Sequence, residues 1–241
     1  MERSPYSTLK LDNNGFADFS GMTGLQTAVS RHNLKTVGDI LACRGIFSNR
    51  SFNIDSQGNE GDTALIMATI RRDERIVELL LSYGANPDIQ NNGGETALIK
   101  GAQVGAYDSV GLLVKNHANL DMQDVHGNTA LIHCINKNND DMLEELIGGG
   151  ADLDIQNSDG MTALHVCVKL HERNTSRQIY RYTSKQIKML MSNGANPNIR
   201  DIDGDIAENL NDSLVVKECI KEAAHEYSTR KEHERMWFDE T

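Results

Sequence analysis

Two cysteine–histidine pairs are the part of this sequence whose chemistry would suit an enzyme or a metal site. His133 is followed directly by Cys134, and His165 lies two residues before Cys167. Imidazole and thiolate groups bind Zn²⁺, and a cysteine beside a histidine can serve as an activated nucleophile. However, Cys134 and Cys167 are separated by 33 residues, and neither lies in a C-x-x-C motif. The spacing points to a repeating element rather than to one shared site.

Other patterns with a chemical meaning are weak. The acidic stretch over residues 201–205 is similar to part of a calcium-binding loop, but the glutamate expected at the twelfth position of such a loop is missing. The glycines at 93–94 and 148–150 do not form a phosphate-binding loop. We therefore expect no catalytic residues, no cofactor and no metal, and we do not predict an enzyme.

The chain repeats itself every 33 residues. Thr63-Ala64-Leu65 recurs with threonine at 96, 129 and 162. A second phrase keeps the same period at residues 83–90, 116–123 and 149–156, and returns at 193–200. Two separate phrases that recur in register indicate copies of one structural unit.

Each phrase has a mechanical reason. A turn glycine precedes the threonine in every copy, where a positive φ is accessible to glycine. The threonine can cap a helix by accepting a backbone N–H. A second helix, rich in leucine, ends at Gly84, Gly150 or Gly194, and His117 takes this C-cap position in one copy. The unit is therefore two short helices that follow a tight turn.

This pattern resembles the ankyrin repeat family, and the resemblance covers residues 21–224. It implies an all-α fold, an ankyrin-repeat solenoid of stacked helix-turn-helix units joined by β-hairpin-like loops. We expect six units, near residues 21–59, 60–92, 93–125, 126–158, 159–202 and 203–224. The first unit has seven extra residues and the fifth has eleven.

Two terminal segments flank the predicted repeat domain. Residues 1–20 are expected to be a flexible N-terminal segment, and residues 225–241 a charged helical tail. The tail contains an apolar run, Met236-Trp237-Phe238. Two interpretations of this run stay open: it folds back on the last repeat, or it is a short motif for another protein.

The repeat also explains the cysteines and the histidine. Cys134 and Cys167 occupy the position of Ala68 and Gly101 in other copies, so we interpret them as small core residues on helices too far apart for a disulfide. His165 occupies a position that is isoleucine at 66, 99 and 132. The resemblance implies a structural hydrogen-bonding role for this histidine.

Composition limits the partners. The 24 Lys and Arg against 35 Asp and Glu give a net charge of −11, and only 5% of residues are aromatic. Such an acidic chain is not expected to bind nucleic acid or a membrane, because phosphate binding needs dense basic side chains. The four scattered cysteines suit a reducing compartment, so we expect a cytoplasmic or nuclear monomer whose partner is another protein.

The resemblance places the binding surface on the concave side, at the hairpin tips and the exposed ends of the first helices. The residues at these positions are Glu60, Asp62, Arg71, Asn92, Glu95, Val104, His126, Asn128, Lys137, Ser158 and Met161. Acidic residues at the hairpins predict a basic segment as the partner. The extra residues within 171–186 predict an exposed loop that adds Arg177, Tyr180, Arg181 and Tyr182 to the surface.

We therefore predict a non-enzymatic protein–protein interaction module, an intracellular scaffold or an inhibitor that binds a basic segment of its partner. Two alternatives stay open. One is a substrate-recognition adaptor of a ubiquitin ligase. The other is a pathogen or viral effector that mimics the inhibitors of NF-kappa-B, to which the architecture is similar.

Overall fold

The computed structural model describes residues 23–42, 53–137, 139–173, 177–210, 216–222 and 225. Within residues 171–173 and 177–183 it describes the helical backbone but not the side chains. The predicted segment 1–20, the Met236-Trp237-Phe238 run and the tail after residue 225 lie outside the described residues, and so does Cys43.

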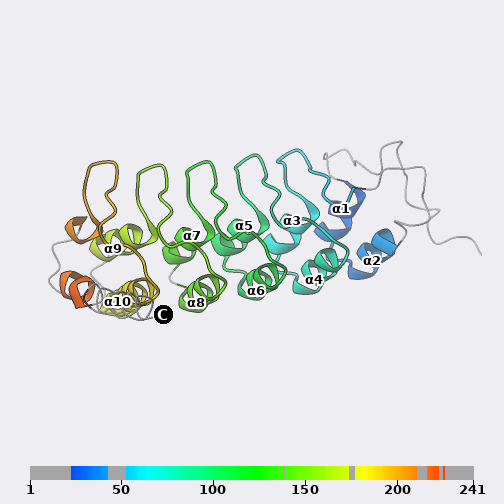
Figure 1. Ribbon diagram of the computed structural model, residues 1–241. Helices are drawn as coiled ribbons and strands as arrows, with labels where there is room; N and C mark the ends of the chain where they lie inside the picture. The colour runs from blue at the N-terminus through cyan, green and yellow to red at the C-terminus, as the bar shows by residue number, and fades with distance from the viewer. Residues whose placement is uncertain are drawn as a thin grey trace, which may run out of the picture. The chain divides into compact units, whose positions relative to one another are not determined.

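The chain divides into two compact units, Met1–Asn119 and Leu120–Thr241, each built from helix pairs (Figure 1). The helices of unit 1 are α1 (Gly24–Ser30), α2 (Leu34–Ala42), α3 (Ala64–Ile70), α4 (Glu74–Ser82), α5 (Ala97–Val104) and α6 (Tyr107–Lys115). Those of unit 2 are α7 (Ala130–Asn136), α8 (Asp140–Gly148), α9 (Ala163–Arg173), α10 (Arg177–Ser192) and the 3-10 helix η2 (Ala207–Leu210). Residues 216–222 are also helical.

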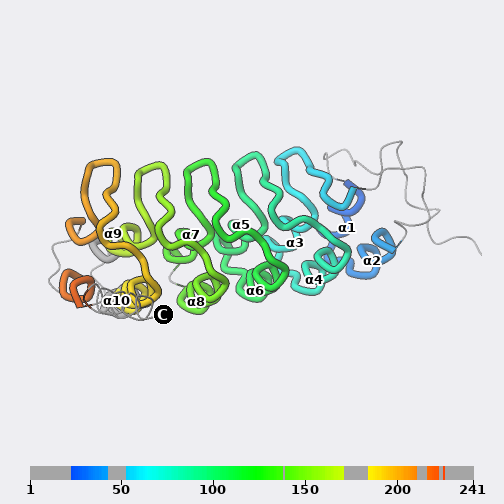
Figure 2. Tube along the Cα trace, in the orientation of Figure 1, coloured from blue at the N-terminus to red at the C-terminus, as the bar shows by residue number. Residues whose placement is uncertain are grey.

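Within each unit the first helices of successive pairs pack side by side, and so do the second helices. In unit 1 the order is α1, α3, α5 in one layer and α2, α4, α6 in the other. In unit 2, α7 packs on α9 and α9 on η2, while α8 packs on α10. Figure 2 follows the chain from each helix pair through a hairpin-like loop to the next. The expected architecture of stacked helix-turn-helix units is confirmed, and the described residues contain no β-strand.

The predicted caps are present. Thr63, Thr96 and Thr129 accept hydrogen bonds from backbone N–H groups three residues on, at 3.2, 3.2 and 3.4 Å. The turn glycines have φ between 70° and 86°. The C-caps are Tyr83, Asn116 and Gly149, and the left-handed residue is the next one: His117 has φ 60°, and Gly84 and Gly150 have 81° and 89°. Local signals in the sequence therefore set the helix ends.

The core lies between the two helix layers and is aliphatic, as the low aromatic content predicts. Leu80 and Leu113 in unit 1, and Leu146 and Leu190 in unit 2, are fully buried. The small-residue position of the first helices is buried as well, including Cys134 and Cys167. A Cβ atom placed on Gly101 would lie 2.8 Å from a methyl group of Val110 on α6 and 3.2 Å from a methyl group of Thr69 on the neighbouring α3. This close approach explains why only small side chains occur there.

The described part of the chain contains no helix that is long and apolar enough to cross a membrane.

Candidate protein-binding surface

The hairpin-like loops have a rigid internal frame. Asn91 accepts two backbone hydrogen bonds with its Oδ1 atom, from Gly93 and Glu95, both at 2.9 Å. Asp124, Asn157 and Asp201 form the same turn in their own loops. Because one side-chain oxygen satisfies two backbone donors, each tip is held in a single conformation.

Neighbouring tips within a unit are also tied together through the backbone. In unit 1 the Asn92 N–H donates to the Glu60 carbonyl at 3.0 Å. In unit 2 the Ser158 N–H donates to the backbone carbonyl of His126 at 2.9 Å, and the Ile202 N–H donates to the backbone carbonyl of Asp159 at 3.2 Å. These bonds use backbone atoms, so the tip side chains can vary without loss of the frame.

The acidic residues of the hairpin-like loops that concern a partner fall into two groups. The carboxylates of the first group, Asp62, Glu95 and Asp124, are occupied, which means that they have hydrogen-bond partners within the protein. Asp62 accepts from the Asn91 amide at 2.8 Å, and the Asp124 carboxylate lies 2.7 Å from Nε2 of His133. Their side-chain oxygens therefore already have partners inside the protein.

Glu95 is the clearest case of an occupied carboxylate. It accepts from Gln103 at 2.8 Å and pairs with Lys100 at 2.5 Å. Burial acts to raise the pKa of Glu95, but the hydrogen bonds from Lys100, Asn91 and Gln103 and the charge of Lys100 outweigh it and hold the pKa below its ordinary value. Glu95 therefore stabilises its own loop.

The second group is exposed at the tips. Glu60 in unit 1, and Asp159 and Asp203 in unit 2, are exposed, and none of them has an ion pair within the part of the chain that the structure describes. They are the acidic side chains that remain available to a partner.

The other predicted surface residues differ in exposure. Those that are exposed are Arg71, Asn92, His126, Lys137 and Ser158, and those that are half-buried are Val104 and Asn128. Met161 is buried, with 7% of its surface exposed, and its sulfur faces the Lys169 ammonium at 3.7 Å. Met161 therefore presents almost no area to a partner.

The sequence interpretation does not include Ile202, the most exposed large apolar residue at a described tip. Ile202 is 74% exposed and Val125 is 64% exposed, both in unit 2. The repeat register could have identified it, because Ile202 occupies the same position as the predicted surface residues Asn92 and Ser158. The full set at this position is Asn59, Asn92, Val125, Ser158 and Ile202. Unit 2 thus adds apolar contacts to its acidic tips.

The expectation of a loop within residues 171–186 is wrong. Helix α9 has 11 residues where α7 has 7, and α10 has 16 where α8 has 9, so the eleven extra residues lengthen two helices. Arg, Gln and Lys are good helix formers, which favours this outcome. Arg177, Tyr180, Arg181 and Tyr182 lie on α10, and their side chains are outside the described part.

The described end of this extension is partly neutralised within unit 2. Lys185 lies 3.2 Å from Asp140 and 3.7 Å from Glu144, both on α8. The buried amide of Gln186 donates to the same Asp140 at 2.9 Å. Asp140 therefore fixes the lengthened α10 to its neighbour.

The cysteine–histidine pairs do not meet in one site. Burial raises the pKa of the Cys134 thiol to about 12 and also raises that of Cys167, with the charge of Asp140 acting in the same direction. A thiol in this state is a poor nucleophile and metal ligand. No group of three or more metal-binding side chains occurs among the residues described.

His165 has a structural environment. It is fully buried, and its Nε2 atom lies 3.3 Å from the Asp205 carbonyl of the next loop. Its Nδ1 atom accepts from the Thr162 N–H at 3.3 Å. The role implied by the resemblance, a hydrogen bond within the fold, agrees with this geometry.

The family model for ankyrin repeats (3 copies) matches residues 7–91, 25–124 and 98–201, which together span more than half of the chain. The chain therefore belongs to the ankyrin repeat family, whose members are protein-interaction modules. A search of curated proteins gives no match.

Solved structures support the same fold. The ankyrin repeat protein EF0377 is 27% identical with a TM-score of 0.69, and the match covers 86% of this chain and 97% of that chain. An ankyrin repeat domain from Acinetobacter baumannii is 22% identical with a TM-score of 0.71, over 83% and 95%. A chain from the Bdellovibrio bacteriovorus predatory endopeptidase Bd0816 in complex with immunity protein Bd3460 is 25% identical with a TM-score of 0.63, over 87% and 98%.

Proposed function

We propose that this protein is a non-enzymatic scaffold or inhibitor that binds a basic segment of a partner protein at its hairpin tips. The observation that carries this proposal is that the backbone of the tips is fixed by hydrogen bonds while acidic side chains on the tips are exposed. The tips of each unit are joined by backbone hydrogen bonds. The side chains of Glu60, Asp159 and Asp203 are exposed, and none of them has an ion pair among the described residues. Exposed carboxylates on the pre-organised tips of each unit favour a basic partner, because little ordering is needed on binding.

Unit 2 supplies an apolar component to this proposal. Ile202 is exposed next to the exposed Asp203 of the same tip, and Val125 is exposed at another tip of unit 2. Exposed apolar side chains flanked by polar residues are typical of binding surfaces. The partner segment proposed for unit 2 therefore carries Lys or Arg next to an aliphatic or aromatic side chain.

The inhibitor role has one further support. A solved structure with 25% identity comes from a complex of an endopeptidase with an immunity protein. The proposed location is the cytoplasm or the nucleus, supported by Cys134 and Cys219, which are free thiols.

The proposal is tested by quantitative affinity capture. The variant Glu60→Lys/Asp159→Lys/Asp203→Lys is compared with Glu78→Lys/Glu218→Lys/Glu222→Lys, which changes the net charge equally at exposed helical sites. We expect the tip variant to lose a basic partner that the wild type and the control retain, by roughly tenfold or more in captured amount. Equal capture by the two variants contradicts the proposal, and recovery of a cullin complex by all three proteins favours the ubiquitin-ligase adaptor instead.

A further inference from the structure

The first two repeats carry basic residue types at three shared positions around the turn between their helices. Arg31 and Arg71, His32 and Arg72, and Lys35 and Arg75 are the corresponding pairs, and all six side chains are exposed. We call these six residues the basic edge of unit 1. The third repeat has Val104, Gly105 and Asp108 at these positions, so the basic edge ends there.

The charges of the basic edge are not compensated inside the protein. Over the ranges that the structure describes, no carboxylate lies within ion-pair distance of Arg31, Lys35, Arg71, Arg72 or Arg75. Lys100, Lys185 and Lys221, by contrast, all have carboxylate partners at 2.5–3.4 Å. Five uncompensated cations on two adjacent repeats are unexpected in a chain of net charge −11.

Hydrogen bonds hold part of the basic edge in place. His32 presents Nδ1 to the Asp73 carboxylate at 3.2 Å and Nε2 to the Arg71 guanidinium at 3.3 Å. Arg71 can only donate, so Nε2 accepts and the hydrogen is assigned to Nδ1. Arg72 donates to the carbonyl of Val104 at the end of α5.

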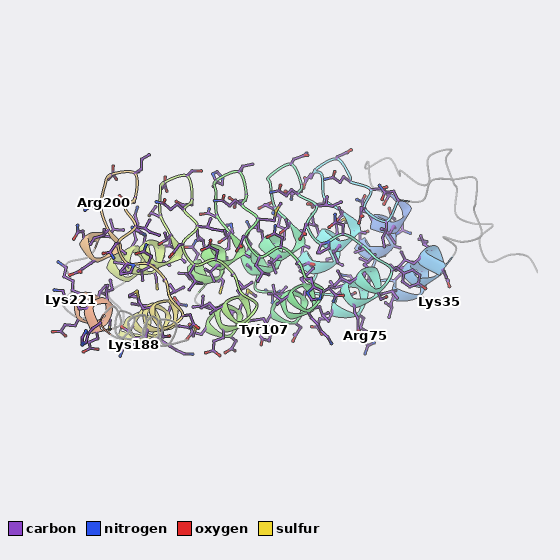
Figure 3. The ribbon with its side chains drawn as sticks, viewed as in Figure 1. Lys35, Arg75, Tyr107, Lys188, Arg200 and Lys221 are labelled. Atoms are coloured by element: carbon purple, nitrogen blue, oxygen red, sulfur yellow. The ribbon has the colours of Figure 1, made fainter. Side chains whose placement is uncertain are left out.

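These contacts leave most of the binding capacity free. A guanidinium has five N–H donors in a planar fork that matches a carboxylate, and Arg71 and Arg72 each use one in the bonds above. The side chains of Arg31, Lys35 and Arg75 make no hydrogen bond among the described residues. Figure 3 shows Lys35 on α2 and Arg75 on the neighbouring α4.

Glu74 and Asp108 place negative charge beside Arg75, on the side of the third repeat. The negative charge of Asp108 on α6 raises the pKa of Glu74, while Arg75 acts in the opposite direction. An anionic partner is therefore favoured over the first two repeats and repelled toward the third.

We infer that the basic edge of unit 1 is a second binding surface, which takes an acidic segment of a partner protein. Corresponding positions on adjacent repeats are about 10 Å apart. Acidic residues three apart on an extended chain have a similar separation, about 10 Å at roughly 3.3 Å per residue. A protein segment is favoured over a nucleic acid because the patch covers two repeats only, and the rest of this acidic chain repels a long polyanion.

This inference is separate from the proposed function, because the edge lies at the helix–helix turns and not at the hairpin tips. It is tested by fluorescence anisotropy with the full chain and a labelled twelve-residue peptide that carries four Asp or Glu at every third position. The variant Lys35→Ala/Arg75→Ala is compared with Lys115→Ala/Lys188→Ala, which removes the same charge from exposed sites on α6 and α10. Two further probes are the same peptide with Asn and Gln in place of the acids, and a twelve-nucleotide oligothymidine.

We expect the acidic peptide to bind the wild type and the control variant with affinities within about twofold, and the basic-edge variant at least about fivefold more weakly, as expected for the loss of two exposed charge pairs. The amide peptide should not bind. Equal affinity for the two double variants overturns the inference, as does the absence of binding to the wild type. If oligothymidine binds more tightly than the peptide, the inference of a protein partner is overturned in favour of a nucleic acid. Circular dichroism of both variants checks that the fold is kept.

Discussion

At the scale of the residue, one repeat position can do the same work with different chemistry. Gln26 in the first repeat and His165 in the fifth occupy the same position. The Gln26 amide donates to the Asp62 carbonyl at 2.6 Å, and Nε2 of His165 faces the Asp205 carbonyl at 3.3 Å. Both side chains thus link a first helix to the next loop, at the repeats that carry extra residues.

The histidine makes this link sensitive to acid. Burial lowers the pKa of His165 below its ordinary value of about 6.5, although the Asp205 carbonyl and the charge of Asp201 act in the opposite direction. Below that pH the unfolded chain takes up a proton that the native state does not. The contribution of His165 is therefore fully present above about pH 6.5 and is lost as the pH falls.

His165→Gln should remove this acid sensitivity while the hydrogen bond is kept, as Gln26 shows. We expect the free energy of unfolding of the wild type to fall more steeply between pH 7.5 and pH 5 than that of the variant, measured by urea denaturation at each pH. His126→Gln, at an exposed tip, should leave the slope of the wild type unchanged. A parallel decline of His165→Gln and wild type would assign the acid sensitivity to other groups.

The turn glycines offer a second comparison between equal positions. Gly127 and Gly204 have φ of 74° and 86°. A Cβ atom on Gly127 would lie 2.8 Å from the backbone nitrogen of Ser158 in the next loop, whereas one on Gly204 meets nothing within 4 Å. The next repeat, and not the turn alone, restricts Gly127.

Gly127→Ala should therefore destabilise more than Gly204→Ala. Both substitutions place a Cβ in the left-handed region, which costs about 1–2 kcal/mol. Only Gly127→Ala also forces two loops apart, and we expect about 3 kcal/mol or more in total for it. Chemical denaturation measures the loss in free energy of unfolding for each variant. Similar losses for the two variants would mean that backbone strain alone accounts for the effect at Gly127.

At the scale of the element, the sequence predicted what is set locally. The threonine caps and the left-handed His117 follow from one residue and its immediate neighbours. The occupied state of Glu95 and Asp124 could not be predicted, because it depends on Lys100 and His133 reaching back from the helix that follows. The lengthened α9 and α10 were missed because the extra residues were interpreted as an insertion between two helices of ordinary repeat length, although their composition favours helix.

The lengthened pair also defines an experiment on the element. Deletion of residues 172–182 brings Thr183 to the position of Asn139, whose side chain caps α8 by accepting from the Met142 N–H at 3.1 Å. Threonine is a good N-cap, and Gln186 keeps its place opposite Asp140. We expect a folded protein whose melting temperature lies within a few degrees of the wild type.

Calorimetry and circular dichroism measure this outcome. The control is deletion of Ala163–Arg173, which has the same length of 11 residues but removes buried residues of α9. That protein should lose the cooperative transition of unit 2. Unfolding of the 172–182 deletion as well would show that the helix extensions are required for stability.

At the scale of the whole molecule, the net charge of −11 acts on stability and on binding with opposite signs. Carboxylates that face each other, such as Glu74 and Asp108, repel one another in the native state. Between 0.01 M and 0.1 M salt the screening length falls from about 30 Å to about 10 Å, so this self-repulsion weakens. The melting temperature should therefore rise with added NaCl over this range, by roughly 1–3 °C.

Both proposed surfaces rely on attraction between opposite charges, which the same salt screens. The affinity of the acidic peptide for the basic edge, and of a basic partner for the tips, should therefore fall over the range in which the melting temperature rises. Calorimetry and anisotropy on one preparation give the two responses together. If the melting temperature fell with added salt together with the affinity, attractive charge pairs and not self-repulsion would dominate the native state. The excess of carboxylates would then not explain why the two surfaces keep uncompensated charges.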